Sequence, residues 1–220
     1  LGAETFLVYN YSLSLTAHNS VLQYYTDKGL VSVIQWKLPP VVAAHVWYNA
    51  QMLMLLDCMY RNKGHTKYLI NTDIDEFIVP VKHPSWEAFL KTQDSACEYR
   101  VRSVSMKGKP CPKDPENKQI CVKSLAMQTR STFIFLDKIR SKCITEVNCQ
   151  ELPGIHFTRR FRVSSGSSNK PVNTSDALLY HYSKFPQDHE YVPDTRMNAY
   201  ATILLSNIRT VLDNLSDKDT

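Results

Sequence analysis

The residues best suited to chemistry in this sequence are the run Asp73-Ile74-Asp75-Glu76, which follows a short apolar segment at residues 67–71. Asp73 and Asp75 are two positions apart, and in extended backbone such side chains point to the same side. Two carboxylates at that spacing can bind a divalent cation such as Mg²⁺ or Mn²⁺. The cation would keep coordination positions for phosphate oxygens and would neutralise a diphosphate leaving group. We therefore predict that Asp73 and Asp75 bind a metal ion and a diphosphate.

A second interpretation of this run is a solvated acidic turn that caps the segment after it. The apolar residues on both sides, 68–70 and 77–79, favour the metal site. Carboxylates so close to a sheet core are costly to bury unless a cation compensates them. An EF-hand is excluded, because neither the repeated Asp/Asn pattern with its glycine nor the downstream glutamate is present.

The segments around the run predict an α/β fold. Short apolar strands at residues 5–9, 31–36 and 67–71 alternate with helices at 19–28 and about 43–60, which is typical of parallel neighbours in one sheet. In open α/β sheets ligands bind beyond the carboxyl ends of the strands, where this run lies. A short helix should start at Ser85 as its N-cap.

The second half of the chain predicts a mixed sheet with few helices. Its expected strands are residues 98–106, 132–136, 154–163 and 177–183, and a last helix is expected at about 195–215. We expect one domain over residues 1–220.

Composition excludes several classes of protein. The chain has 220 residues, 43% of them hydrophobic, and a net charge of +5. Disordered and fibrous proteins do not have this composition. The basic residues are scattered, which gives little support for a nucleic-acid partner. The uncharged stretch at 38–56 contains prolines and polar residues, so it predicts a buried helix and no membrane span.

The cysteines indicate an oxidising compartment. There are six, none in a C-x-x-C pair, and five lie between residues 97 and 149 near loop-like sequence. Zinc binding is therefore disfavoured, and at least two disulfides are expected among these five, with free buried thiols as the alternative. Three N-x-S/T sequons give weak support for a secretory route. The five cysteines are Cys97, Cys111, Cys121, Cys143 and Cys149.

Several motifs in order resemble glycosyltransferase family 92. The run continues as Asp73-Ile74-Asp75-Glu76-Phe77-Ile78-Val79-Pro80, which matches that family's D-x-D-E-F-x-x-P signature. The opening of the chain, Asp57-Cys58-Met59-Tyr60-Arg61-Asn62, Gly154-Ile155-His156-Phe157 and Leu179-Tyr180-His181-Tyr182 also match. The resemblance covers residues 1–185.

The resemblance implies a GT-A fold, a Rossmann-type mixed sheet with helices on both faces. It also implies a nucleotide-sugar donor and a divalent cation, usually Mn²⁺. Members studied as enzymes transfer galactose from UDP-galactose with inversion, including onto core fucose of N-glycans. They are type II membrane proteins of the secretory pathway, which here implies the Golgi lumen. The first nucleotide-binding strand and the membrane anchor are expected upstream of Leu1.

The resemblance also implies roles for particular residues. His181 would be a third metal ligand beside Asp73 and Asp75, with a satisfied strand histidine as the alternative. Tyr9 and Asn10 would border the nucleotide, with simple turn chemistry as the alternative. Arg61 would reach a phosphate, although an arginine there also complements the helix dipole. His156 is a weaker metal candidate.

The catalytic base is not identified by the sequence. Inversion in one step needs a carboxylate near the acceptor hydroxyl, and the sequence does not choose among Asp137, Glu146, Glu151 and Asp176. The competing function is a secreted carbohydrate- or metal-binding module of the same fold without turnover. Acceptor identity, exact donor sugar and oligomeric state stay open.

Overall fold

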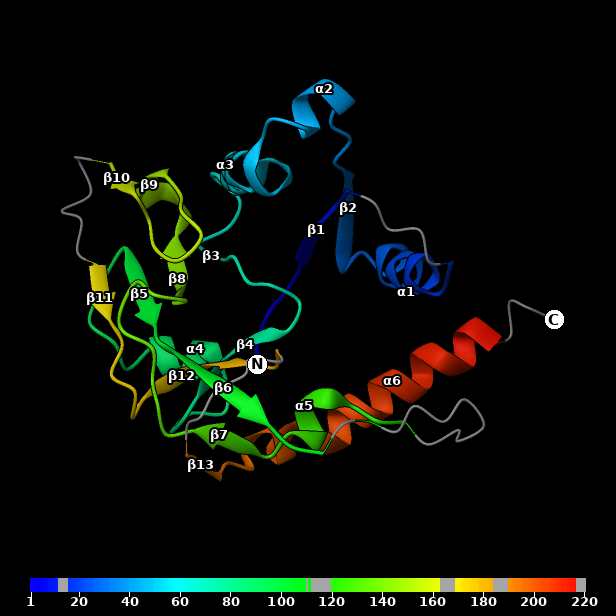
Figure 1. Ribbon diagram of the computed structural model, residues 1–220, viewed down its shortest axis with the longest axis vertical. Helices are drawn as coiled ribbons and strands as arrows, with labels where there is room; N and C mark the ends of the chain where they lie inside the picture. The colour runs from blue at the N-terminus through cyan, green and yellow to red at the C-terminus, as the bar shows by residue number, and fades with distance from the viewer. Residues whose placement is uncertain (12–15, 110, 112–119, 163–168, 184–189, 217–220) are drawn as a thin grey trace. The chain divides into compact units, whose positions relative to one another are not determined.

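The computed structural model describes residues 1–11, 16–109, 111, 120–162, 169–183 and 190–216. The chain divides into two compact units (Figure 1). Unit 1 comprises Leu1 and Leu55–Ala199, and unit 2 comprises Gly2–Met54 and Tyr200–Thr220. The predicted single domain over residues 1–220 stays a prediction. None of the described helices is long and apolar enough to cross a membrane.

Unit 2 contains the predicted strand–helix–strand arrangement. Strand β1 (Phe6–Asn10) pairs in parallel with β2 (Val31–Gln35), and helix α1 (Thr16–Asp27) connects them. Gly29 ends the helix with φ +69, a left-handed conformation that favours glycine. The amides of Gly29 and Leu30 bond the carbonyls of Thr26 and Tyr25, at 2.9 and 3.0 Å. Helix α6 (Ala201–Ser216) contacts α1 in the same unit.

The single helix predicted over residues 43–60 is wrong. The chain forms helix α2 (Pro40–Ala43), a 3₁₀ turn η1 (Trp47–Ala50) and helix α3 (Gln51–Asn62). Tyr48 and Asn49 have φ values of 48 and 53, which a right-handed helix cannot accommodate. The indole of Trp36 donates to the Asn49 carbonyl at 3.0 Å and supports the break. The apolar stripe continued across this break, so periodicity alone did not reveal it.

Unit 1 is built on two mixed sheets and a small hairpin. The sheet orders are β11-β5-β8-β3, β13-β7-β6-β12-β4 and β10-β9. The strands are β3 (Tyr68–Ile70), β4 (Glu76–Pro80), β5 (Glu98–Val101), β6 (Ser103–Lys107), β7 (Thr129–Ser131), β8 (Lys142–Glu146), β9 (Gln150–Leu152), β10 (Arg160–Phe161), β11 (Asn169–Pro171), β12 (Ala177–His181) and β13 (Tyr191–Pro193). Short helical segments connect them: α4 (Trp86–Leu90), α5 (Lys123–Ala126), η2 (Val147–Cys149) and η4 (Arg196–Tyr200).

Several predicted strands need correction. The third strand, β3, was expected parallel to β1 and β2, but it pairs antiparallel with β8 in unit 1. The segment 132–136 is not a strand; there the guanidinium of Arg102 binds the carbonyls of Ile134 and Phe135 at 3.2 and 2.8 Å. Within 154–162 only β10 is extended. Residue 163, predicted to end that strand, lies outside the described residues.

The core of unit 1 lies where α4 and strands of both sheets meet. Ile78, Phe89, Tyr99, Ile144 and Leu179 are each 2% exposed or less and belong to one apolar cluster. The predicted cap of α4 is confirmed, since the Ser85 hydroxyl accepts the Ala88 amide at 3.2 Å. At one edge this core gives way to the polar ends of β4, β8 and β12.

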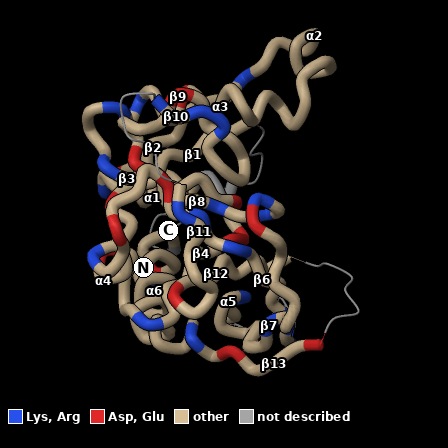
Figure 2. Tube along the Cα trace, turned by 90° about the vertical axis from the view of Figure 1, so that its left-hand side faces the viewer, with Lys and Arg blue, Asp and Glu red and all other residues tan. Residues whose placement is uncertain are grey.

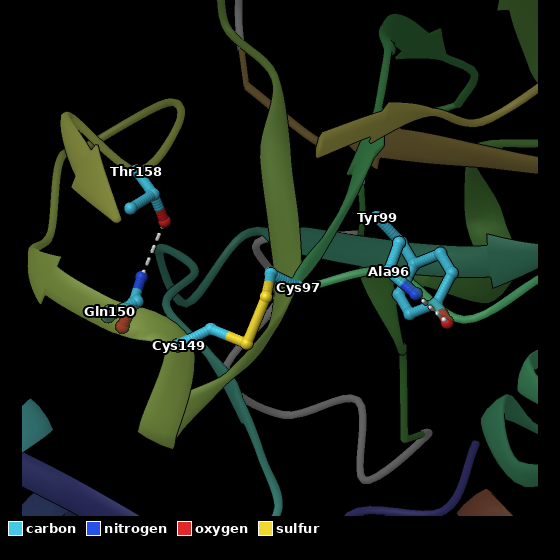
Figure 3. Close-up of a disulfide and its surroundings, with 6 residues drawn as sticks. All are labelled: Ala96, Cys97, Tyr99, Cys149, Gln150 and Thr158. Atoms are coloured by element: carbon cyan, nitrogen blue, oxygen red, sulfur yellow. Dashed lines mark hydrogen bonds between the residues drawn. A yellow bond between two sulfur atoms is a disulfide. The ribbon is translucent and has the colours of Figure 1, made fainter. Parts of the chain in front are cut away.

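Two disulfides are present, as predicted from the cysteine positions. Cys97 pairs with Cys149 and Cys111 with Cys121. Figure 3 shows the Cys97–Cys149 bridge joining the start of β5 to the segment before β9, with Gln150 bonded to Thr158 at 2.7 Å beside it. The remaining cysteines, Cys58 and Cys143, are free. Disulfides are typical of proteins of the secretory pathway.

Candidate active site

The acidic residues lie in a turn between β3 and β4. The Glu76 amide bonds the Asp73 carbonyl at 3.1 Å, and the Asp73 amide bonds a Glu76 carboxylate oxygen, also at 3.1 Å. Ile74 at the tip is fully exposed. The expected extended backbone is therefore wrong at this point, and the two aspartates are presented by a turn. We call Asp73, Asp75 and Glu76 the acidic cluster.

Strand pairing brings His181 to the acidic cluster. In the antiparallel pair β4–β12, His181 is opposite Glu76, and the Tyr182 amide bonds the Asp75 carbonyl at 2.9 Å. The two ring nitrogens of His181 lie 3.7 Å from Asp75 Oδ2 and 3.8 Å from Glu76 Oε1. His181 thus lies beside the acidic cluster, although its position in the sequence is 105 residues after Glu76. Its role as a ligand stays a prediction.

The positively charged side chain beside the acidic cluster is Lys142, which the sequence pattern did not single out. Its ammonium lies 3.1 Å from Glu76 Oε2 and 3.3 Å from Asp73 Oδ2. The Lys142 and Glu76 side chains are each 3% exposed, whereas Asp73 is 55% exposed. Lys142 could be identified only once β8 was known to be a strand, because the pattern Lys-Cys-Ile-Thr-Glu did not predict one.

The donor types of the cluster fit a divalent cation. Asp75 and His181 offer an oxygen and a nitrogen, which both suit Mn²⁺. Asp73 is exposed enough to join them, but its carboxylate faces Lys142. Within the described residues, no group of three or more His, Cys, Asp or Glu is already arranged around one metal position. Asp73 would therefore have to move from Lys142 to complete a ligand set.

The predicted nucleotide-sugar residues have local partners. Arg61 pairs with Asp57 at 2.6 Å, one turn earlier on α3. Tyr9 and Asn10 belong to unit 2, where the Tyr9 ring meets Trp36 edge to face and the Asn10 carbonyl accepts the Trp36 amide at 2.9 Å. Their roles at a nucleotide stay predictions.

A buried ionic network supports β8 from the other face of its sheet. The Arg100 guanidinium binds Asp137 in bidentate fashion at 2.6 and 2.7 Å and Glu98 at 2.9 Å. The second carboxylate oxygen of Glu98 accepts the Thr158 amide at 2.6 Å. Glu98 is fully buried and Arg100 is 3% exposed, so the Glu98 carboxylate depends on Arg100 as its counter-ion. The network holds the loop before β8 and the segment around Thr158 against the sheet.

His156 belongs to this supporting layer. One of its ring nitrogens lies 3.1 Å from the Ser141 carbonyl, and the Cys143 thiol bonds the His156 carbonyl at 3.4 Å. Burial raises the pKa of that thiol well above its usual value. His156 therefore contacts Ser141 and Cys143, the two residues on either side of Lys142 in the sequence.

The four carboxylates considered as the catalytic base have other contacts. Hydrogen bonding to Arg100 lowers the pKa of Asp137, which makes it a weaker base. Glu151 pairs with Arg160 at 3.1 Å.

The other two carboxylates lie at the far ends of their strands from the acidic cluster. Asp176 pairs with Lys82 and precedes β12, whereas His181 is the last residue of β12, so roughly 16 Å of strand separates Asp176 from His181. Glu146 likewise ends β8 at the opposite end from Lys142. None of the four reaches the acidic cluster through a described contact, and the base stays unassigned.

Comparison with known proteins agrees with the arrangement of these motifs. Beta-1,4-galactosyltransferase galt-1 of Caenorhabditis elegans is 29% identical to the chain over 194 residues. The match covers 82% of this chain and 41% of that relative, so the chain spans about two fifths of the relative's length. The model of glycosyltransferase family 92 matches residues 1–217. Because that match includes both the acidic turn and the strand that carries His181, the chain belongs to glycosyltransferase family 92.

Proposed function

We propose that this chain is part of the catalytic region of a metal-dependent galactosyltransferase. It would transfer galactose from UDP-galactose, with inversion, to a glycan on a glycoprotein or glycolipid. Core fucose of N-glycans is the acceptor that the family resemblance suggests. The supporting observation is the meeting of Asp73, Asp75, Glu76 and His181 at one end of β4 and β12.

The name of the relative supports the galactosyl donor and the inversion. The name of galt-1 states a beta-1,4-galactosyl product. UDP-galactose carries its sugar in the α configuration, so a β product requires inversion at the anomeric carbon. The two disulfides are consistent with a site in the secretory pathway, and we place the full-length protein in the Golgi lumen.

The exposure of each side chain decides the role that we propose for it in the site. Asp75 and His181 would bind Mn²⁺, and Asp73 would join them on the exposed side of the turn. Bound there, the cation would neutralise the charge of the departing UDP diphosphate. Glu76 stays buried and holds the turn through the Asp73 amide. Tyr182, through its backbone amide, keeps Asp75 against the end of β12.

The test is transfer from UDP-galactose by the full-length protein with the single change Asp75→Asn. We expect activity to fall at least a hundredfold, about 3 kcal/mol of barrier, because the cation loses a charged ligand. The melting temperature in metal-free buffer should barely change, since the Asp75 side chain is 36% exposed. Asp94→Asn is the matched control, because Asp94 lies outside the cluster and is 94% exposed.

Three outcomes would contradict the proposal. Full activity of Asp75→Asn, or wild-type activity that survives EDTA, would remove the metal from the mechanism. Mn²⁺ and UDP binding without UDP release in the presence of acceptor glycans would instead favour the binding-module alternative.

A further inference from the structure

Lys142 has two partners of different character. Glu76 is as buried as the lysine itself, at 3% exposure, and their charged atoms are 3.1 Å apart. Asp73 is 55% exposed and 3.3 Å away. A buried carboxylate without a counter-ion is strongly destabilising, whereas an exposed one is solvated by water. Lys142 is therefore the obligatory partner of Glu76 and an exchangeable partner of Asp73.

The same lysine is placed to oppose a cation. A metal ion that binds Asp73 must draw its carboxylate away from Lys142, and it would also be repelled by the ammonium. Lys142 is nearly fully covered by protein, so water screens this repulsion less than it would at the surface. The amount by which Lys142 weakens metal binding then equals the amount by which the bound metal weakens the Lys142–Asp73 interaction, because both are the same coupling free energy.

We propose that Lys142 is a positioning residue that holds the acidic turn in its metal-free form and weakens metal binding by competing for Asp73. The inference rests on the proposed metal-dependent transfer. With Asp73 held by Lys142, the turn keeps one geometry in the absence of metal. The competition keeps Mn²⁺ affinity moderate, so that the ion exchanges instead of staying permanently bound.

The variants must separate this competition from simple loss of folding. Lys142→Met alone leaves Glu76 buried without a counter-ion, and we expect a fall of several degrees in the metal-free melting temperature. The informative comparison is between Glu76→Gln and the double variant Glu76→Gln/Lys142→Met. In both, position 76 is neutral and its amide oxygen can still accept the Asp73 amide. The two differ only in the ammonium of Lys142.

The measurement is Mn²⁺ binding alone, by electron paramagnetic resonance of the free ion, in the full chain. We expect the double variant to bind Mn²⁺ about tenfold more tightly than Glu76→Gln. The rise in melting temperature on adding Mn²⁺ should be larger for the double variant too. Lys91→Met is the control, because Lys91 pairs with Glu87 on the surface of α4 and should leave Mn²⁺ affinity unchanged.

The outcomes distinguish this inference from the proposed function. Equal Mn²⁺ affinity in Glu76→Gln and the double variant would overturn the inference and leave the proposed function standing. Weaker binding by the double variant would also overturn it and would make Lys142 a support of the metal site. If wild type and both variants bind no Mn²⁺, the metal dependence fails and the inference fails with it.

Discussion

At the scale of single residues, exposure decides what each charge of the site can do. Asp73 and Asp75 are exposed enough for a metal ion to reach them. Glu76 and Lys142 are buried and hold the turn in place. In the described part of the trace, Lys and Arg positions are interspersed with Asp and Glu positions (Figure 2). An ion pair outside the site joins Arg100 to Asp137 at 2.6 Å.

The Arg100–Asp137 pair should make stability depend on pH in a defined direction. Hydrogen bonding to Arg100 lowers the Asp137 pKa in the folded state below its ordinary value of 3.8. A lowered pKa stabilises the fold above the unfolded value of about 3.9 and loses this effect as pH falls through the folded value. We expect Asp137→Asn to cost about 1–2 kcal/mol at pH 7, after allowing for partial exposure of Asp137.

Urea unfolding at pH 7, 5 and 3.5 checks this expectation. The gap between wild type and Asp137→Asn should be constant between pH 7 and 5 and should shrink below about pH 4. The control is Asp94→Asn, whose carboxylate pairs with Lys170 at the surface. A gap that widens on acidification would refute the assignment of the pair.

At the scale of elements, two strands assemble the site. Strand β4 starts at the end of the acidic turn, and β12 pairs with it so that His181 is opposite Glu76. The neighbouring residue Tyr180 lies on the other face of β12, where its hydroxyl bonds Asp194 at 2.6 Å and accepts from Arg196 at 2.8 Å. Burial raises the pKa of Tyr180, so this hydroxyl stays protonated as a donor. The bond ties β12 to the segment after β13.

Tyr180→Phe should therefore weaken the fold without weakening the site. Loss of the hydroxyl leaves the buried Asp194 carboxylate with one donor fewer, at a cost of about 1–2 kcal/mol in unfolding free energy. Mn²⁺ affinity should not change, because the β4–β12 backbone bonds that place His181 are kept. Tyr60→Phe is the control, at a residue that is 59% exposed. A loss of Mn²⁺ affinity with unchanged stability would show the opposite division of roles.

At the scale of the molecule, two disulfides of different span restrain unit 1. The Cys97–Cys149 bridge spans 52 residues and joins β5 to the end of β8 through η2, whereas Cys111–Cys121 spans 10. Loop-closure entropy in the unfolded chain grows with the span. The longer bridge should therefore contribute more to stability than the shorter one.

Removing each bridge by a pair of alanines tests this order. The entropy model predicts a loss of about 4 kcal/mol for Cys97→Ala/Cys149→Ala and about 3 kcal/mol for Cys111→Ala/Cys121→Ala. Denaturant unfolding under non-reducing conditions gives both values. Mass spectrometry of the denatured, unreduced wild type should find two alkylated thiols, Cys58 and Cys143. Alkylation of four or more would refute the pairing.

Local patterns in the sequence were sufficient for features whose cause is local. The parallel pair β1–β2, the Ser85 cap of α4 and the presence of disulfides follow from short apolar runs, one capping residue and the even number of cysteines. The acidic motif was also found, because paired aspartates after a short apolar strand are unusual enough to be noticed. Its turn geometry was not, since propensity does not distinguish a strand that ends at residue 70 from one that continues.

Only the tertiary structure decided what surrounds that motif. The partner of β3 is β8, more than 70 residues later in the chain, and no local pattern encodes a pairing at that distance. Strand β8 brings the Lys142 ammonium into contact with the Glu76 carboxylate, and β12 brings His181 beside Asp75. The sequence by itself therefore indicated the family and located the acidic motif. The counter-ion and the geometry of the site depend on long-range strand pairing, which buries some charges and leaves others in water.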